Sequence, residues 1–163
     1  MHYSESVAGE RLDRIDRDLV VALQNNARIS NKDLAALVGL APSTCLERVR
    51  ALRARGVLRG FHAEVDRSAL GRSLEAMVAV RVRPHSRENV DLFWRYVLEL
   101  PEVIEVFHVT GADDFLVHVG VPDMNDLRDF VLDRLTVRAE VAHVESHLIY
   151  AQGRRPILEP LYD

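Results

Sequence analysis

Residues 30–56 read SNKDLAALVGLAPSTCLERVRALRARG, and this stretch predicts two short helices separated by a tight turn. Ser30 can accept the first free N–H groups of a helix, and Gly39 can end that helix in a left-handed conformation. Pro42 is tolerated in the first turn of a helix, because its missing N–H would have no partner there. A second helix is therefore expected over residues 43–55.

The helix expected over residues 43–55 has two unlike faces. At about 100° per residue, Cys45, Val49 and Leu52 share an inner side. The outer side and its flanks carry hydroxyl and charged groups that can reach base edges and phosphates in a DNA groove. In helix-turn-helix docking the preceding helix crosses the phosphate backbone. We therefore expect DNA contacts from Asn31, Lys32, Ser43, Thr44, Glu47, Arg48, Arg50, Arg53 and Arg55.

Two alternatives stay open for this face. A solvated amphipathic helix has the same pattern, although a third helix, a short turn and a basic charge bias in the same module favour DNA binding. Arg48 lies at the flank, where it could contact a phosphate, or pair with Asp16 or Asp18 and fix the helices to one another.

The charges are distributed unevenly along the chain. Residues 1–62 hold ten Lys/Arg against seven Asp/Glu, and residues 63–163 hold eleven against eighteen, for a net charge of -4. A basic module on an acidic body favours a polyanion-binding head and weakens indiscriminate nucleic-acid binding. No signal peptide or membrane span is expected, and one cysteine, Cys45, forms no internal disulfide, so we expect a cytoplasmic protein.

The segments on either side of residues 30–56 complete the first half of the chain. Apolar residues recur every three or four positions over residues 12–23. This pattern predicts another helix, which precedes the two helices already described. Residues 57–65 have β character, with Gly60 where a wing-like hairpin or a hinge could bend. Residues 66–73 carry Asp, Ser and Gly and form the best boundary between modules.

The second half predicts the order β-α-β-β-α-β. The expected strands are residues 74–82, 103–110, 115–121 and 141–150, and the expected helices are 87–100 and 122–135. This is the ferredoxin-like order, in which both helices cover one face of an antiparallel sheet. The opposite face carries Met77 and Ala79, so self-association through the sheets is expected.

We therefore expect an α+β chain with four parts. They are a helix-turn-helix domain over 1–62, a linker or hinge over 63–73, a ferredoxin-like effector and oligomerisation domain over 74–152, and an irregular arm over 153–163.

Several motifs resemble those of the leucine- and asparagine-responsive (Lrp/AsnC) regulators. They are Leu12-Asp13-Arg14-Ile15-Asp16, Asn26-Ala27-Arg28-Ile29-Ser30, Leu34-Ala35-Ala36-Leu37-Val38-Gly39-Leu40, Arg48-Val49-Arg50-Ala51-Leu52, Gly56-Val57-Leu58 and Thr110-Gly111-Ala112-Asp113-Asp114. The resemblance implies a winged helix-turn-helix, a ferredoxin-like domain of the RAM type, dimers paired through their sheets, and assembly to tetramers or octamers. It further implies sequence-specific regulation of transcription from inverted-repeat operators on double-stranded DNA.

The resemblance also implies a small effector, commonly an amino acid, bound between dimers. Transferred by position, its site would involve Thr110, Gly111, Ala112, Asp113, Asp114 and Ser146. A physical argument supports the loop, because glycine permits close approach and a carboxylate could hold an ammonium group. A plain hairpin turn is the alternative. The segment 138–140 lacks the family's usual glycine, so the sequence does not identify the effector.

Other features indicate no metal or cofactor. The seven histidines form no ligand cluster, and Cys45 is expected to be a buried thiol rather than a redox sensor. His143 and His147 alternate with Glu145 and could titrate at a subunit interface. Two other functions are alternatives: a sirohaem-decarboxylase-like enzyme on a similar architecture, which the arginine-rich helix disfavours, and a nucleoid-type architectural protein, which the acidic body disfavours.

Overall fold

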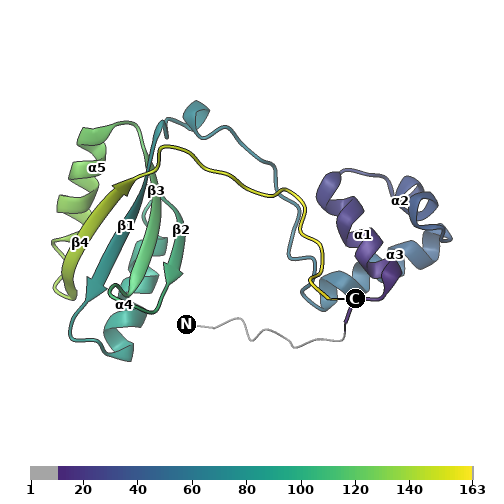
Figure 1. Cartoon of the computed structure of the whole chain (residues 1–163), viewed down its shortest axis with the longest axis horizontal. Helices are drawn as coiled ribbons and strands as arrows, with labels where there is room; N and C mark the ends of the chain where they lie inside the picture. The colour runs from purple at the N-terminus through teal and green to yellow at the C-terminus, as the bar shows by residue number, and fades with distance from the viewer. Residues whose placement is uncertain (1–10, 163) are drawn as a thin grey trace. The chain divides into compact units, whose positions relative to one another are not determined.

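The computed structural model describes residues 11–162, which form two compact units (Figure 1). One unit contains the chain up to Glu64 together with the segment that starts at Gly153, and the other spans Val65–Gln152. Each unit has its own hydrophobic core.

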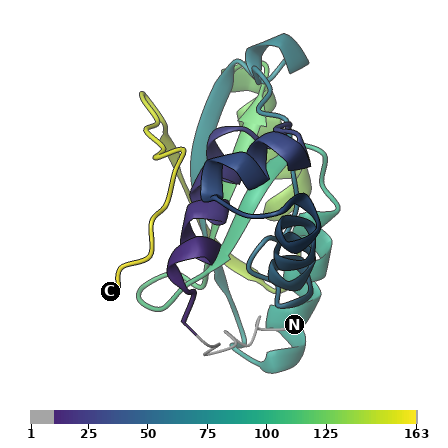
Figure 2. The same ribbon diagram turned by 90° about the vertical axis from the view of Figure 1, so that its right-hand side faces the viewer.

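The first unit is built from three helices, α1 (Arg14–Asn25), α2 (Asn31–Val38) and α3 (Pro42–Ala54). They cross one another and do not run in parallel (Figure 2). The sequence-based helix boundaries of α2 are confirmed: the Ser30 side chain caps its start, and Gly39 ends it at φ 70°. Apolar residues from all three helices, Leu19, Leu34, Cys45 and Leu52, are buried together in the core.

The strand expected over residues 57–65 does not form. The backbone N–H groups of Val57 and Leu58 donate to the Leu52 carbonyl oxygen at 3.0 and 3.2 Å, so they complete the end of α3. Gly56 takes φ 70° at this turn, a left-handed conformation that favours glycine. From there to Val65 the chain is irregular, and the wing-like hairpin is replaced by an extended connection. A hinge at Gly60 remains a prediction.

The second unit has the predicted β-α-β-β-α-β order. Its elements are a short 3₁₀ turn η1 (Ser68–Leu70), β1 (Leu74–Val82), α4 (Arg87–Leu98), β2 (Val103–His108), β3 (Phe115–Val121), α5 (Met124–Phe130), a π-helical turn η2 (Val131–Leu135) and β4 (Val141–Leu148). The strands form one antiparallel sheet in the order β2-β3-β1-β4, which confirms the ferredoxin-like topology.

The two faces of this sheet differ, as the alternation in β1 predicts. Val78, Val80 and Val82 point to one face and are fully buried against Phe93 of α4 and Phe130 of α5. The other face carries the remaining β1 side chains and their neighbours in register, Glu75, Met77, Ala79, Arg81, Leu116, His118, His143, Glu145 and His147. Within residues 11–162 no helix packs on this open face.

Candidate nucleic-acid interface and effector loop

The outer face of α3 presents uncommitted polar side chains. Ser43, Thr44, Glu47, Arg50 and Arg53 are all exposed. Among the described residues, no hydrogen bond or ion pair engages the side chains of Glu47, Arg50 or Arg53. The guanidinium groups of Arg50 and Arg53 are therefore available to phosphates and base edges, and the Glu47 carboxylate is available to donors on base edges.

The start of α3 is also open. Its N-cap is Ala41, whose side chain cannot accept a hydrogen bond, so the first backbone N–H groups of α3 have no side-chain cap. Asn31 holds α2 against this point, because its Nδ2 donates to the Pro42 carbonyl oxygen at 2.8 Å. Asn31 thus has a structural contact in addition to its predicted DNA contact, while Lys32 is exposed.

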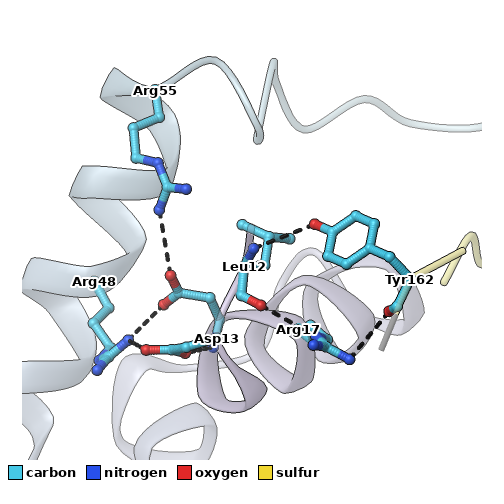
Figure 3. A network of polar contacts seen from close by, with 7 residues as sticks. Leu12, Asp13, Arg17, Arg48, Arg55 and Tyr162 are labelled. Carbon is cyan, nitrogen blue, oxygen red and sulfur yellow. Dashed lines mark hydrogen bonds and ion pairs between the residues drawn. The ribbon is translucent and has the colours of Figure 1, made fainter. Parts of the chain in front are cut away.

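Arg48 and Arg55, at the flank of α3, bind acidic residues of the same unit (Figure 3). Arg48 Nη1 lies 2.7 Å from Asp13 Oδ2 and 2.8 Å from Asp16 Oδ1. Arg55 Nη1 lies 3.4 Å from Asp16 Oδ2. Asp16 is almost completely buried, and these arginines compensate the cost of burying its charge. Of the two interpretations of Arg48, the structure shows the pairing with Asp16.

Asp13 has a structural role that the sequence does not predict. Its side chain accepts the Asp16 N–H at 2.7 Å, which caps α1, and its second oxygen binds Arg48. The backbone hydrogen bond and then the Arg48 guanidinium lower the pKa of the Asp13 carboxyl below its ordinary value. The two carboxylates correspondingly raise the pKa of Arg48, first through Asp13 and then through Asp16. A carboxylate directly before a helix is a capping signal, but its pairing with a residue 35 positions away leaves no local trace.

The second candidate site is the loop between β2 and β3. Gly111 takes φ 126°, a conformation that L side chains rarely adopt, and no heavy atom beyond its chain neighbours lies within 4 Å of the position that a Cβ would take. Thr110, Gly111 and Ala112 are exposed, and Asp113 is half-buried. Arg81 of β1 holds the loop: its Nε donates to the Ala112 carbonyl oxygen at 2.8 Å, and its Nη2 lies 3.4 Å from Asp113 Oδ1.

Asp114 differs from Asp113 because its carboxylate is already occupied. It is buried, and its Oδ2 accepts the Val82 N–H at 2.7 Å and a bond from Arg83 at 3.2 Å. Its Oδ1 lies 3.0 Å from His85 Nδ1. The side chain of Asp114 therefore fixes the loop to the end of β1. Asp113 makes one long contact, with Arg81, and a ligand could replace that contact.

Ser146 lies apart from the loop within one chain. It is exposed on β4, where it is paired with Val78, whereas the loop is bound to Val80 and Val82 on the far side of β1. Thr110 to Asp114 are thus brought together by the structure, and Ser146 is not brought into contact with them.

Further clusters of polar side chains in the second unit join histidines to carboxylates. His118, on the open face, is buried with Nε2 2.7 Å from Glu75 Oε2, and Arg67 binds the same oxygen at 2.6 Å. His147 Nε2 lies 3.8 Å from Glu145 Oε1. Among the described residues no group of three or more His, Cys, Asp or Glu side chains is arranged to hold a metal ion. Cys45 is buried, and burial raises the pKa of its thiol. No helix in residues 11–162 is both long and apolar enough to cross a membrane.

An exposed polar helix in a three-helix unit, joined to a ferredoxin-like unit, is the arrangement of a helix-turn-helix DNA-binding protein with a second domain. Two family descriptions match this chain: "AsnC-type helix-turn-helix domain" over residues 12–53, and "Lrp/AsnC ligand binding domain" over residues 75–155. The chain belongs to the Lrp/AsnC family of transcriptional regulators.

Individual relatives agree with this assignment over nearly the whole chain. The HTH-type transcriptional regulator AldR of Mycolicibacterium smegmatis is 40% identical over 150 residues, which are 92% of this chain and 88% of that protein. The leucine-responsive regulatory protein of Escherichia coli K12 is 36% identical over 152 residues, 93% of each chain. The structure of a transcriptional regulator from Neisseria meningitidis in complex with L-Met has a TM-score of 0.82 at 30% identity, covering 89% of this chain and 94% of that one. These relatives give no support to the decarboxylase or nucleoid alternatives.

Proposed function

We propose that this regulator binds inverted-repeat operators as a homodimer, or as a larger assembly of dimers, and that an amino acid modulates its binding. The observation that supports DNA binding is that the polar side chains of α3 fall into two groups. Arg48 and Arg55 are engaged with acidic residues of their own unit, whereas Glu47, Arg50 and Arg53 are exposed on the outer face. Such a regulator acts where the DNA is, which agrees with the cytoplasmic location that the sequence predicts.

Arg50 provides the test of base recognition. Arg50→Ala removes an exposed guanidinium from the middle of the outer face, and we expect operator affinity to fall by about 1–3 kcal/mol if Arg50 binds a base edge. The measurement is fluorescence anisotropy with a selected genomic fragment and a random competitor at moderate ionic strength. The matched control is Arg128→Ala, which removes the same charge from the surface of the second unit, where the Arg128 guanidinium binds the exposed Asp129.

The outcomes separate three cases. A loss confined to the selected fragment indicates base recognition, and an equal loss on all fragments indicates a phosphate contact. If Arg50→Ala and Arg128→Ala bind the fragment alike, the outer face of α3 does not bind DNA and the proposal fails.

The effector proposal rests on the β2–β3 loop and on the relative that was solved with L-Met. Gly111 leaves room for a ligand, Arg81 can bind a carboxylate, and Asp113 can bind an ammonium group, so the loop offers both charges that a free amino acid needs. Thermal-shift measurements with the twenty amino acids test this, because a ligand that binds only the native state raises its melting temperature. No shift with any of them at millimolar concentration would remove the amino-acid assignment.

A further inference from the structure

Leu158 and Tyr162 bind the α1 region, although the sequence predicts only an irregular arm there. Residues 156–162 lie beyond both family matches, which end at residues 53 and 155. They nevertheless make paired contacts with the helix-turn-helix unit, at Leu158 and at Tyr162. We call residues 153–162 the arm.

Tyr162 makes the densest set of contacts (Figure 3). Its hydroxyl oxygen accepts the Leu12 N–H at 3.2 Å, and its carbonyl oxygen accepts a bond from Arg17 Nη1 at 3.3 Å. The guanidinium groups of Arg11 and Arg17 each lie 5.5 Å from the centre of its ring, within the range of a cation–π contact. Arg17 Nε also donates to the Leu12 carbonyl oxygen at 3.2 Å. The hydroxyl, the ring and the backbone carbonyl of Tyr162 are therefore all bound by residues just before α1 or in its first turn.

Leu158 adds a second point of attachment. Gln24 Nε2 donates to the Leu158 carbonyl oxygen, and the Leu158 N–H donates to Gln24 Oε1, both at 2.9 Å. One glutamine amide thus satisfies both backbone groups of a single arm residue. Gln24 and Arg17 are two turns apart on α1, so the arm follows the length of the helix.

The other end of the arm is attached to the second unit. Gln152, directly before it, accepts a bond from Arg67 Nη1 at 2.8 Å through its Oε1, and the same nitrogen binds Glu75 of β1 at 2.6 Å. Five residues, 153–157, lie between the two attachments. Because an extended residue spans no more than about 3.6 Å, the arm can stretch only to about 20 Å while both ends hold.

The attachment point on α1 is next to the contacts of α3. Leu12, which Tyr162 binds, directly precedes Asp13, and Asp13 both caps α1 and binds Arg48 of α3. A continuous chain of contacts therefore runs from Tyr162 through Leu12 and Asp13 to the helix that presents the predicted DNA-binding residues. Contiguity of this kind makes coupling possible, and a coupling measurement has to establish it.

We propose that α1 and the residue before its cap form a docking surface for the C-terminal segment of this chain, with contacts from Leu12, Arg17 and Gln24. The docked arm is then a strap between the ferredoxin-like unit and the helix-turn-helix unit that contains α3. A covalent strap of fixed reach, in addition to the linker, restricts how far the two units can reorient. The docking stands on the contacts alone. Its consequence for operator choice rests on the proposed function.

Amide hydrogen exchange on the full chain tests the docking. Tyr162→Ala removes the ring and hydroxyl contacts, and we expect exchange at Leu12 and the first turn of α1 to accelerate about tenfold or more. Tyr162→Phe keeps the ring and removes only the hydroxyl, so the acceleration is confined to Leu12. The matched control is Tyr150→Ala, because Tyr150 is 97% exposed. Unchanged exchange within β1 and an unchanged far-UV circular dichroism spectrum show that each variant is folded. If Tyr162→Ala leaves exchange at Leu12 at the level of Tyr150→Ala, the docking surface is wrong.

Operator spacing tests the strap. The wild-type chain should lose about tenfold or more in affinity when the half-sites of its operator are moved apart by half a helical turn, about 5 bp. Tyr162→Ala should lose much less, because freed units can turn to follow the half-sites. An equal loss in both proteins overturns the strap, while the exchange result still decides the docking. If no operator is found at all, the proposed function fails, and the exchange result is unaffected.

Discussion

Asp13 makes the first unit sensitive to acid. Its cap and its contact with Arg48 lower its pKa in the folded chain, so its contribution to stability is complete above its ordinary pKa of 3.8. That contribution is lost as the pH falls through the lower, folded pKa. We expect the melting temperature of the first unit to fall on acidification below about pH 4. Asp13→Asn, which keeps a capping acceptor, should lower it at neutral pH and flatten this fall.

Measuring Asp13→Asn in an Arg48→Met background separates the effect of the Asp13–Arg48 ion pair from the effects of the other carboxylates. Without the guanidinium, Asp13 keeps only its cap, and so Asp13→Asn should cost less there than in the wild-type chain. Thermal denaturation followed by circular dichroism at several pH values measures this difference. An equal effect of Asp13→Asn in both backgrounds would show that the ion pair contributes nothing.

At this scale the sequence predicts which residues face outward but not how they pair. Periodicity places Cys45 and Leu52 on the inner face of α3 and Arg50 on its outer face, and the structure agrees. It leaves Arg48 with two possible roles, because a residue at the edge of a helix face can turn either way. The choice depends on Asp13 and Asp16, which lie more than 30 positions away and are brought close only by packing.

Among the elements, the β2–β3 loop carries two aspartates that differ in burial: Asp114 is buried, whereas Asp113 is half-buried and is the one that we propose binds the effector. Asp114→Ala leaves the buried Val82 N–H without its acceptor, and we expect a loss of about 1–3 kcal/mol in the free energy of unfolding of the second unit. Asp113→Ala breaks only a 3.4 Å contact with Arg81, so its stability should change by less than about 1 kcal/mol. Urea denaturation measures both changes. Equal losses would mean that the loop is held by both aspartates.

The elements themselves are largely predictable, and the exception has a local cause. The caps at Ser30 and Gly39 and the alternation in β1 are encoded within a few residues, so their boundaries follow from the sequence. Residues 57–65 have strand-forming composition, but the N–H groups of Val57 and Leu58 complete the end of α3. Composition cannot show that a backbone donor is already engaged. The arm is the converse case, because its partners on α1 lie more than 130 positions away.

At the scale of the whole molecule, the open face of the sheet is where we propose that two copies meet. Leu116→Asp places a charge beside Ala79, and we expect it to dissociate the dimer and, because two half-sites must be bound together, to reduce operator affinity about tenfold or more. Leu132→Asp is the matched control, since Leu132 is half-exposed outside the sheet, in η2. Sedimentation velocity gives the assembly size, and anisotropy gives the affinity. The interface lies elsewhere if Leu116→Asp sediments as the wild-type chain does, whereas a folded monomer that retains full operator affinity would show that each copy binds DNA alone.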